Sequence, residues 1–251
     1  MFAPTRLLFF IGALLLLNSC NAQEDTYVYN PPANDSSNTS NNNDSITADV
    51  KYLALGDSYT IGESVCETCR YPQQLKAALL RNGVESVDLK IIAQTGWTTR
   101  NLSNGIDAES PSSDYDLVTL LIGVNNQYQH QQFSVYEKEF PELLKRAIAF
   151  AKGDASHVIV ISIPDYAYTP FGENSANNET ISEEIDQYNS FASQEAYKQN
   201  VLFVNITDIT RNGLNNPDLV ASDGLHPSKQ AYSQFVDRLL PRVLDILNVK
   251  N

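Results

Sequence analysis

The sequence has few cysteines and few basic residues, and each shortage excludes a class of protein. Three cysteines in 251 residues are too few for a small scaffold held by many disulfides. The 17 lysines and arginines are outnumbered by 30 acidic residues, which gives a formal net charge of −13. Such a surface repels a phosphate backbone, so we expect no nucleic-acid partner. With 42% hydrophobic residues, the remaining composition is that of a globular chain.

Apolar runs long enough to cross a bilayer are also missing. The run from Leu7 to Leu17 is too short for an ordinary membrane span. It follows Arg6 and precedes Ser19 and Cys20, and this order of a basic start, an apolar core and small residues is typical of an export signal. The signal resembles that of a bacterial lipoprotein, which implies cleavage before Cys20 and acylation of that cysteine. The alternative is ordinary cleavage after Ala22, which would give a free secreted protein.

The segment that follows has little that could pack into a core. It contains no lysine or arginine and is rich in asparagine, serine and aspartate. Such a segment cannot bury enough apolar area to offset its ordering entropy. We therefore expect a lipoprotein signal peptide at 1–19, a disordered tether at 20–50 and one folded domain at 51–251. The protein would be anchored to a bacterial membrane in the cell envelope, facing the periplasm or the surface, or would be secreted. No obligate protein partner is evident.

Two cysteines remain if Cys20 is acylated, and they stand close together as Cys66 and Cys69. In an exported protein such a pair predicts a local disulfide. Free thiols or a redox or metal role are the alternatives. Nothing thioredoxin-like surrounds the pair, and structural zinc takes about four ligands where two are offered here.

Short apolar runs alternate with helical patterns along the predicted domain. The apolar runs, which lack strict alternation and are rich in β-branched residues, lie at 51–55, 87–93, 117–122, 157–163 and 201–204. They predict strands buried on both faces. Helical periodicity is found at 72–81, 136–152, 181–198 and 232–247, and Pro241 is expected to kink or split the last helix. This alternation predicts a parallel sheet covered by helices, with reactive groups beyond the carboxyl ends of the strands.

A candidate nucleophile and a candidate base lie at such strand ends. Ser58 follows the first predicted strand, and a serine nucleophile needs a base, usually histidine. Of the three histidines, His130 lies in a polar loop and His157 begins a strand at the opposite edge. Elimination leaves His226, and Asp223 in the same short loop could orient its imidazole. The alternative for this pair is an ordinary loop histidine with a capping aspartate.

Acyl transfer also requires hydrogen-bond donors for the developing oxyanion. Gly96 follows the second predicted strand, where its backbone N–H could approach a substrate, and Asn125 follows the third with a side-chain amide. Either residue alone would more often serve a turn.

Taken together and in this order, these segments resemble the SGNH/GDSL hydrolases, over essentially the whole predicted domain. The matching blocks are Gly56-Asp57-Ser58, then Gly96, then Gly123-Val124-Asn125, and last Asp223 with His226. Two positions depart from the family pattern: Tyr59 stands where the short signature has leucine, and Asn126 replaces an acid. Both lie beside the chemistry and leave the catalytic set intact.

The resemblance implies a flavodoxin-like α/β/α sandwich of three layers around a five-stranded parallel sheet. It also implies a hydrolase of esters or thioesters that needs no metal or cofactor. Ser58, Asp223 and His226 would form the catalytic set, and Ser58, Gly96 and Asn125 would hold the oxyanion. The expected substrates are lipid-like acyl esters, including lysophospholipids. The alternatives are a carbohydrate O-deacetylase and a catalytically silent binding lipoprotein.

Aromatic and polar residues after the strand ends are candidates for the substrate pocket. They are Trp97, Asn126, Tyr128 and Tyr166, with Tyr168 and Phe171 further along the same segment. The alternative is that these side chains cover the edge of the sheet as core or rim.

Overall fold

The computed structural model describes residues 49–175 and 178–249. Within them, five strands form one parallel sheet with the order β2-β1-β3-β4-β5. The strands are β1 (Asp49–Gly56), β2 (Ser86–Ala93), β3 (Leu117–Leu121), β4 (Val158–Ile161) and β5 (Leu202–Val204). The expected five-stranded parallel sheet is therefore confirmed. The first strand starts two residues before the expected domain boundary, because Asp49 and Val50 pair with the start of β2.

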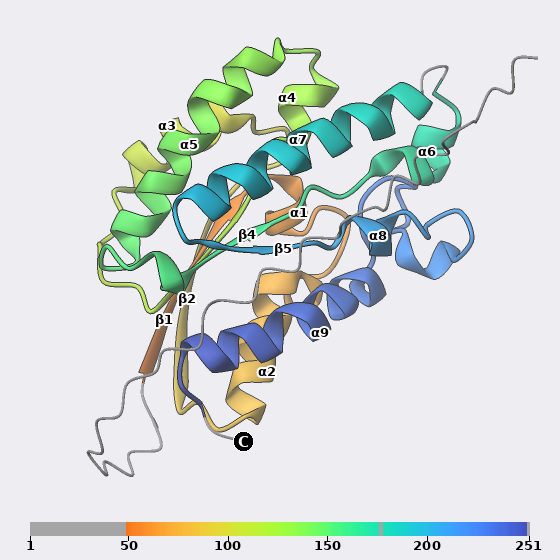
Figure 1. Ribbon diagram of the computed structural model, residues 1–251. Coiled ribbons are helices and arrows are strands. Elements are labelled where there is room, and N and C mark those ends of the chain that lie inside the picture. Colours follow the sequence, from red (N-terminus) through yellow and green to blue (C-terminus); the bar gives the residue numbers. More distant parts are fainter. Residues whose placement is uncertain (1–48, 176–177, 250–251) are drawn as a thin grey trace, which may run out of the picture. The chain divides into compact units, whose positions relative to one another are not determined.

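Helices cover both faces of the sheet, which confirms the three-layer architecture (Figure 1). One face is covered by α2 (Tyr71–Arg81) and α9 (Lys229–Ile246), and the other by α3 (Thr99–Glu109), α5 (Phe133–Phe150) and α7 (Asn178–Lys198). Four single-turn helices follow strands or lie in loops: α1 (Ser58–Ile61), α4 (Val124–Tyr128), α6 (Pro170–Glu173) and α8 (Thr207–Thr210).

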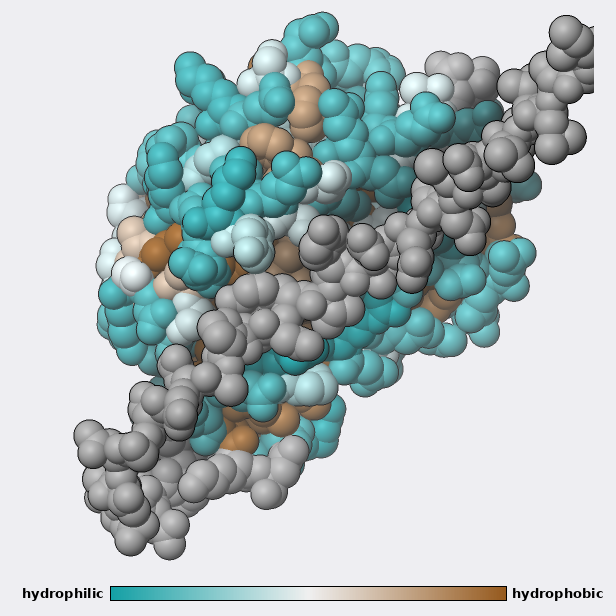
Figure 2. Space-filling view, viewed as in Figure 1, coloured by the Kyte–Doolittle hydropathy of each residue, from teal (hydrophilic) through white to brown (hydrophobic). Residues whose placement is uncertain are grey.

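The burial of the strands explains their sequence. Every residue of β3 and β4 is buried, and so is β1 from Tyr52 onward. A central strand with helices on both faces has no solvent side, so it reads as a continuous apolar run. The molecular surface differs: the face seen in Figure 2 is mostly hydrophilic, as expected for a chain with net charge −13.

The strand order places a topological switch point where the candidate site is expected. From β1 the chain moves outward to β2 and then crosses back to β3 on the other side of β1. The segments that follow β1 and β3 therefore leave the sheet in opposite directions, and ligands of such sheets bind at this switch point. Ser58 directly follows β1, and Asn125 follows β3.

Two helices differ from the sequence expectation. Periodicity located no helix between β2 and β3, because the segment that forms α3 is rich in asparagine, serine and glycine. A capping box between Thr98 and Asn101 starts this helix, and the Trp97 ring lies so close to Gly105 that an added Cβ would come within 2.3 Å of it. In α9, Pro241 does not split the helix, which continues to Ile246.

The solvent exposure of Pro241 explains why α9 continues. A proline removes one helical hydrogen bond, to the carbonyl four residues earlier at Asp237. Both residues face solvent, where water can satisfy that carbonyl, whereas Leu239 and Val243 on the other side are buried. Packing of the apolar face therefore holds the helix together. Among the residues that the structure describes, no helix is both long and apolar enough to cross a membrane.

Candidate active site

Ser58 lies in a tight turn at the carboxyl end of β1. Asp57 caps the helix α1, and its Oδ1 accepts a hydrogen bond of 3.0 Å from the backbone N–H of Tyr59. Ser58 is the first residue of that helix, where backbone N–H groups have no partner within the helix. The turn requires glycine at position 56, since an added Cβ would lie 2.1 Å from Thr60 Oγ1. The N–H of Ser58 is thus left available to an oxyanion.

Asp223 and His226 form a hydrogen-bonded pair within one loop. His226 Nδ1 lies 2.6 Å from Asp223 Oδ2. The other carboxylate oxygen accepts the backbone N–H groups of Leu225 and His226, at 2.9 and 3.0 Å. Burial favours a higher pKa for Asp223, but hydrogen bonds from Ser64, His226 and these N–H groups outweigh it and hold the pKa well below its usual range. The carboxylate is therefore ionised and fixed in orientation.

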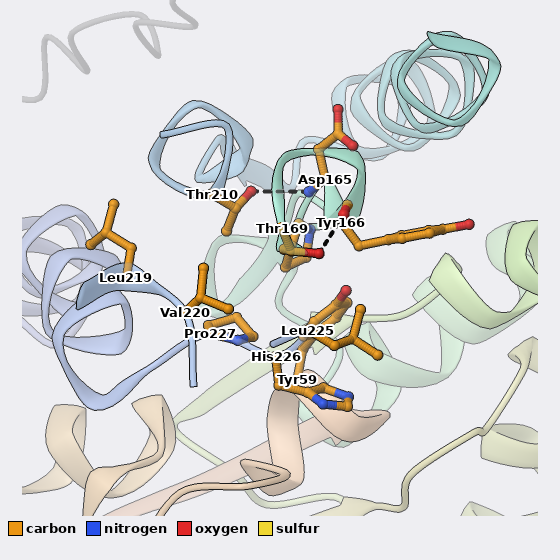
Figure 3. Close-up of a pocket in the computed structure, with 11 residues that line it drawn as sticks. Tyr59, Asp165, Tyr166, Thr169, Thr210, Leu219, Val220, Leu225, His226 and Pro227 are labelled. Atoms are coloured by element: carbon orange, nitrogen blue, oxygen red, sulfur yellow. Dashed lines mark hydrogen bonds between the residues drawn. The ribbon is translucent and has the colours of Figure 1, made fainter. Parts of the chain in front are cut away.

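The nucleophile turn and the histidine loop meet through an aromatic contact. Tyr59, the residue after Ser58, packs edge-to-face against His226 with ring centroids 5.8 Å apart. Figure 3 shows the two side chains next to each other at the same pocket. The other histidines lie elsewhere: His130 is exposed, and His157 precedes β4 with Nδ1 2.7 Å from the carbonyl oxygen of Asp116. The structure thus places the turn that carries Ser58 against the loop that carries His226.

Gly96 and Asn125, the two further oxyanion candidates, lie in two segments that hydrogen-bond to each other. Gly96 adopts a left-handed conformation with φ of 84° in an exposed turn after β2. The side chain of Asn125 donates a hydrogen bond of 3.0 Å to the carbonyl of Trp97, and Gln129 donates one of 3.0 Å to the carbonyl of Gly96. An amide has two N–H donors, so one on Asn125 fixes the loop while the other remains for a ligand. Gly96 and Asn125 therefore belong to one hydrogen-bonded unit.

Two of the residues expected in the pocket have structural contacts instead. Asn126 has 0% exposure, and its side chain bonds to the backbone and hydroxyl of Thr99 and to Gln131. The expectation that Asn126 lines a pocket is therefore wrong, because no surface of it is accessible. Trp97 is half-buried and packs against Gly105 and the core.

Tyr166 lines a pocket beside His226, and Tyr128 lies outside it. The pocket lies between the segment that follows β4 and the loop of Asp223 and His226 (Figure 3). Its volume is about 10 Å³, which is room for about one water molecule. Tyr166 is buried, and its hydroxyl donates to Gln127 at 2.9 Å. Burial raises the pKa of Tyr166 to about 12, so the hydroxyl is neutral. Tyr128 is 49% exposed and packs on the Tyr166 ring, with centroids 5.9 Å apart.

Asp165, to which the sequence assigned no role, holds the pocket wall in place. It is completely buried, and its Oδ1 accepts the backbone N–H of Ala167 at 3.0 Å. Its Oδ2 accepts from Ser182 Oγ at 2.7 Å and from Arg211 Nε at 3.0 Å. A buried carboxylate with these partners ties the segment after β4 to α7 and α8. Its side-chain partners Ser182 and Arg211 lie 17 and 46 residues away in the sequence, so the sequence carried no local signal for them.

The structure joins Cys66 and Cys69 in a disulfide, with Cα atoms 4.9 Å apart, in the loop that follows α1. Cys20, the expected acylation site, lies outside the described residues, as do the signal peptide and all of the tether up to residue 48. Between residues 49 and 175 and between 178 and 249, no group of three or more histidine, cysteine or acidic side chains could hold a metal ion.

Comparisons with solved structures agree on the fold. An esterase, EstA, from Pseudoalteromonas is 18% identical, with 79% of this chain and 98% of that chain covered and a TM-score of 0.57. The acetylxylan esterase Axe2 from Geobacillus stearothermophilus is 21% identical over 77% of this chain and 94% of that chain, with a TM-score of 0.55. A lipase/acylhydrolase from Enterococcus faecalis is 21% identical over 77% and 95%, with a TM-score of 0.58.

The sequence itself matches a family over most of the described fold. No curated protein matches this chain. Residues 54–234 match the sequence model of the GDSL-like lipase/acylhydrolase family. The match spans the nucleophile turn at Ser58, the loop of Gly96, the segment of Asn125 and the loop that holds Asp223 and His226. The chain therefore belongs to the GDSL-like lipase/acylhydrolase family, whose members hydrolyse esters.

Proposed function

We propose that Ser58 is the nucleophile of a serine esterase. Its Oγ attacks the acyl carbon of an ester while His226 accepts the proton as general base. The imidazole then protonates the departing alcohol, and an acyl group stays on Ser58. Water attacks this acyl-enzyme with His226 again as base, which releases the acid and restores the serine. Asp223 orients the ring and stabilises its charged form.

The oxyanion of each tetrahedral intermediate is held by the N–H groups of Ser58 and Gly96 and by the side-chain amide of Asn125. Donors fixed before reaction stabilise charge without reorganising, and removing one typically costs about 3 kcal/mol in the barrier. The bond from Asn125 to Trp97 supports such fixation.

The observation that carries the proposal is the 2.6 Å bond between His226 Nδ1 and Asp223 Oδ2, with Tyr59 packed on the imidazole. A histidine that merely fills a loop would not need an ionised carboxylate on one nitrogen and the nucleophile turn against its ring. The family membership supports the same reading.

The test is hydrolysis of p-nitrophenyl acetate by the full chain, beside Ser58→Ala and the control Ser112→Ala. Ser112 lies in an exposed loop, where its hydroxyl contacts Asp114. We expect activity in the wild type and the control and none in Ser58→Ala, with labelling of Ser58 by an organophosphonate. A folded wild type that neither hydrolyses the ester nor reacts with the phosphonate would instead be a silent binding lipoprotein.

Two substrate classes are candidates, one from the sequence and one from the surroundings of His226. The sequence favours lipid-like acyl esters, including lysophospholipids and thioesters. One observation favours the second candidate, a carbohydrate O-deacetylase: the rings of Tyr128 and Phe171 are 49% and 44% exposed and lie 6.3 Å apart. The N–H of Phe171 donates to the carbonyl of Gly224, next to Asp223, so this aromatic surface adjoins the catalytic loop. Flat exposed rings suit the faces of a sugar. The likeness to an acetylxylan esterase agrees with this candidate.

Acyl-chain length separates the two classes. We would compare p-nitrophenyl acetate, butyrate, octanoate and palmitate, and then an acetylated xylo-oligosaccharide. Strict preference for acetate, with Phe171→Ala raising KM for the oligosaccharide and leaving p-nitrophenyl acetate unchanged, supports deacetylation. Octanoate as the better substrate supports lipid-like esters.

We also propose that the protein is a lipoprotein of the bacterial cell envelope, acylated at Cys20. The order of Arg6, the apolar run and Cys20 supports this, and so does the Cys66–Cys69 disulfide, since disulfides persist in oxidising compartments. Two or three acyl chains would hold the protein firmly on a membrane. Mass spectrometry of the N-terminal peptide tests this, with Cys20→Ser as the control. An unmodified N-terminus at Gln23 would show secretion instead.

A further inference from the structure

The loop between α1 and α2 carries two adjacent side chains that contact other parts of the active site. Ser64 Oγ donates a hydrogen bond of 2.5 Å to Asp223 Oδ2, the same oxygen that His226 Nδ1 contacts. Glu63 accepts a hydrogen bond from the hydroxyl of Thr95, which directly precedes Gly96. One dipeptide thus connects the nucleophile turn to the acid of the catalytic set and to an oxyanion loop.

The local structure around Ser64 shows that this placement is imposed on the backbone. Ser64 has φ of 64°, a left-handed conformation that side-chain-bearing residues adopt at a cost. The Cys66–Cys69 disulfide follows at once, and Arg70 donates to the carbonyl of Ile61 at 3.3 Å. The disulfide and the hydrogen bond from Arg70 therefore restrain the loop, and they keep Ser64 in its left-handed conformation facing Asp223.

We propose that Glu63 and Ser64 are positioning residues for this esterase, held in place by the Cys66–Cys69 disulfide. The inference rests on the proposed function. Ser64 acts through Asp223, and Glu63 acts through the loop of Gly96. Neither residue touches the reacting atoms.

The hydrogen bond of Ser64 matters for orientation more than for stability. Both partners are exposed, and a hydrogen bond between groups that water can reach adds little to the free energy of unfolding. Its geometry is nevertheless specific, because it fixes the carboxylate oxygen that must face the imidazole while positive charge develops there. A mobile carboxylate stabilises that charge less well, which lowers kcat and leaves KM unchanged.

Two substitutions at position 64 separate a positioning role from a structural one. Ser64→Gly removes the hydroxyl but relieves the left-handed backbone, so the fold is kept or improved. Ser64→Asn also suits this conformation and restores a side-chain donor. We expect Ser64→Gly to lower kcat for p-nitrophenyl acetate about tenfold, as for a lost hydrogen bond to a charged group. We expect Ser64→Asn to recover part of that loss.

A control in the same loop shows whether the effect is local to the hydroxyl of Ser64. Thr68→Ala removes an exposed hydroxyl that contacts Cys66 Sγ and should leave kcat unchanged. Wild-type kcat in Ser64→Gly, or a fall in KM alone, would overturn the role of Ser64.

The contact of Glu63 is tested by Thr95→Val, which removes the hydroxyl at an exposed site and keeps the shape of the side chain. We expect a smaller fall in kcat, which adds to that of Ser64→Gly because the two residues act on different loops. An unchanged kcat in Thr95→Val would remove Glu63 from the proposal.

The disulfide is tested by a mutant cycle. If it acts by holding Glu63 and Ser64, then Cys66→Ser with Cys69→Ser should lower kcat in the wild type and have a smaller effect in Ser64→Gly, where only the contact of Glu63 remains to be lost. Independent, additive losses would overturn this role for the disulfide. Every comparison requires an active wild type and an inactive Ser58→Ala. A wild type without esterase activity would refute the proposed function, whereas an active wild type with an equally active Ser64→Gly would refute this inference.

Discussion

The side chain of Asn126 holds the first residue of α3 by two hydrogen bonds. Its Oδ1 accepts the backbone N–H of Thr99 at 3.0 Å, and its Nδ2 donates to Thr99 Oγ1 at 2.7 Å. The same hydroxyl donates to Glu139 Oε2 at 2.6 Å. Because the Thr99 hydroxyl donates its proton to Glu139, its oxygen can only accept a further hydrogen bond. An amide can donate that bond, and an ionised carboxylate cannot. This pairing explains why an amide stands where the family pattern has an acid.

We expect Asn126→Asp to destabilise the fold although it restores the family motif. A carboxylate at this fully buried site would lose the bond to Thr99 Oγ1 and lie near Glu139, at a cost of about 2–3 kcal/mol. Burial would raise the pKa of the new acid, so the loss should be larger at pH 8 than at pH 5. Urea unfolding at both pH values measures this, with exposed Asn104→Asp in α3 as the control. Equal stability of Asn126→Asp and wild type would contradict the role assigned to the amide.

Asn125→Ala should lower kcat about 100-fold, as expected for a lost oxyanion donor. The substitution also removes the bond to the carbonyl of Trp97, so the melting temperature must be measured in parallel. Gln129→Ala removes the neighbouring bond to the carbonyl of Gly96 and serves as the matched control for loop mobility. Hydrolysis of p-nitrophenyl acetate by Asn125→Ala at the wild-type rate would exclude this residue from the oxyanion site.

The stability of the fold should fall between about pH 4 and pH 7 through Asp57. Burial raises the pKa of this carboxyl from 3.8 to about 7, and its Oδ2 has no hydrogen-bond partner among the described residues. The folded state therefore keeps a proton that the unfolded state releases, and ionising the carboxyl destabilises the fold as pH rises. Asp57→Asn keeps the cap on Tyr59 and cannot ionise. The unfolding free energy of Asp57→Asn minus that of the wild type should rise by on the order of 3–4 kcal/mol from pH 4 to pH 8. A pH-independent difference would refute this.

Asp165→Ala should destabilise the protein by about 3 kcal/mol, because it leaves Arg211 without its buried partner. The wall that carries Tyr166 would lose its anchor to α7 and α8, so we expect faster hydrogen exchange in residues 164–169. Asp186→Ala removes the exposed partner of the same arginine, 2.7 Å away, and should cost well under 1 kcal/mol. Similar losses in both variants would show that the buried contact has no special weight.

Much of the fold was predictable because local patterns carried it. The central strands appear as apolar runs because helices bury both of their faces, and α2 and α5 show their buried stripes in the sequence. Ser58, Gly96 and Asn125 were found because each one follows a strand whose carboxyl end lies at the same edge, and His226 was found by elimination among the three histidines. The prediction failed for α3, whose segment has low helix propensity and is fixed by the cap at Thr98 and the ring of Trp97.

Contacts between distant segments could not be predicted. The bond from Ser64 to Asp223 joins residues 159 positions apart, and nothing in the local sequence of either residue indicates it. Asn126 was expected to line a pocket because it follows a strand end, but side-chain direction within the turn of α4 decides burial, and that direction is set by the docking of α3. Pro241 has an unfavourable local preference that the packing of α9 overrides.

The pairing of α9 with α2 also bears on synthesis of the chain. Tyr232 at the start of α9 packs on Tyr71 at the start of α2, with ring centroids 6.3 Å apart, and the loop of Asp223 and His226 immediately precedes α9. A nascent chain that has already emerged from the ribosome through α7 would carry the serine without its acid and base. Hydrolysis can therefore begin only after the loop of Asp223 and His226 has been synthesised and α9 has docked on α2, so the onset of esterase activity reports that docking.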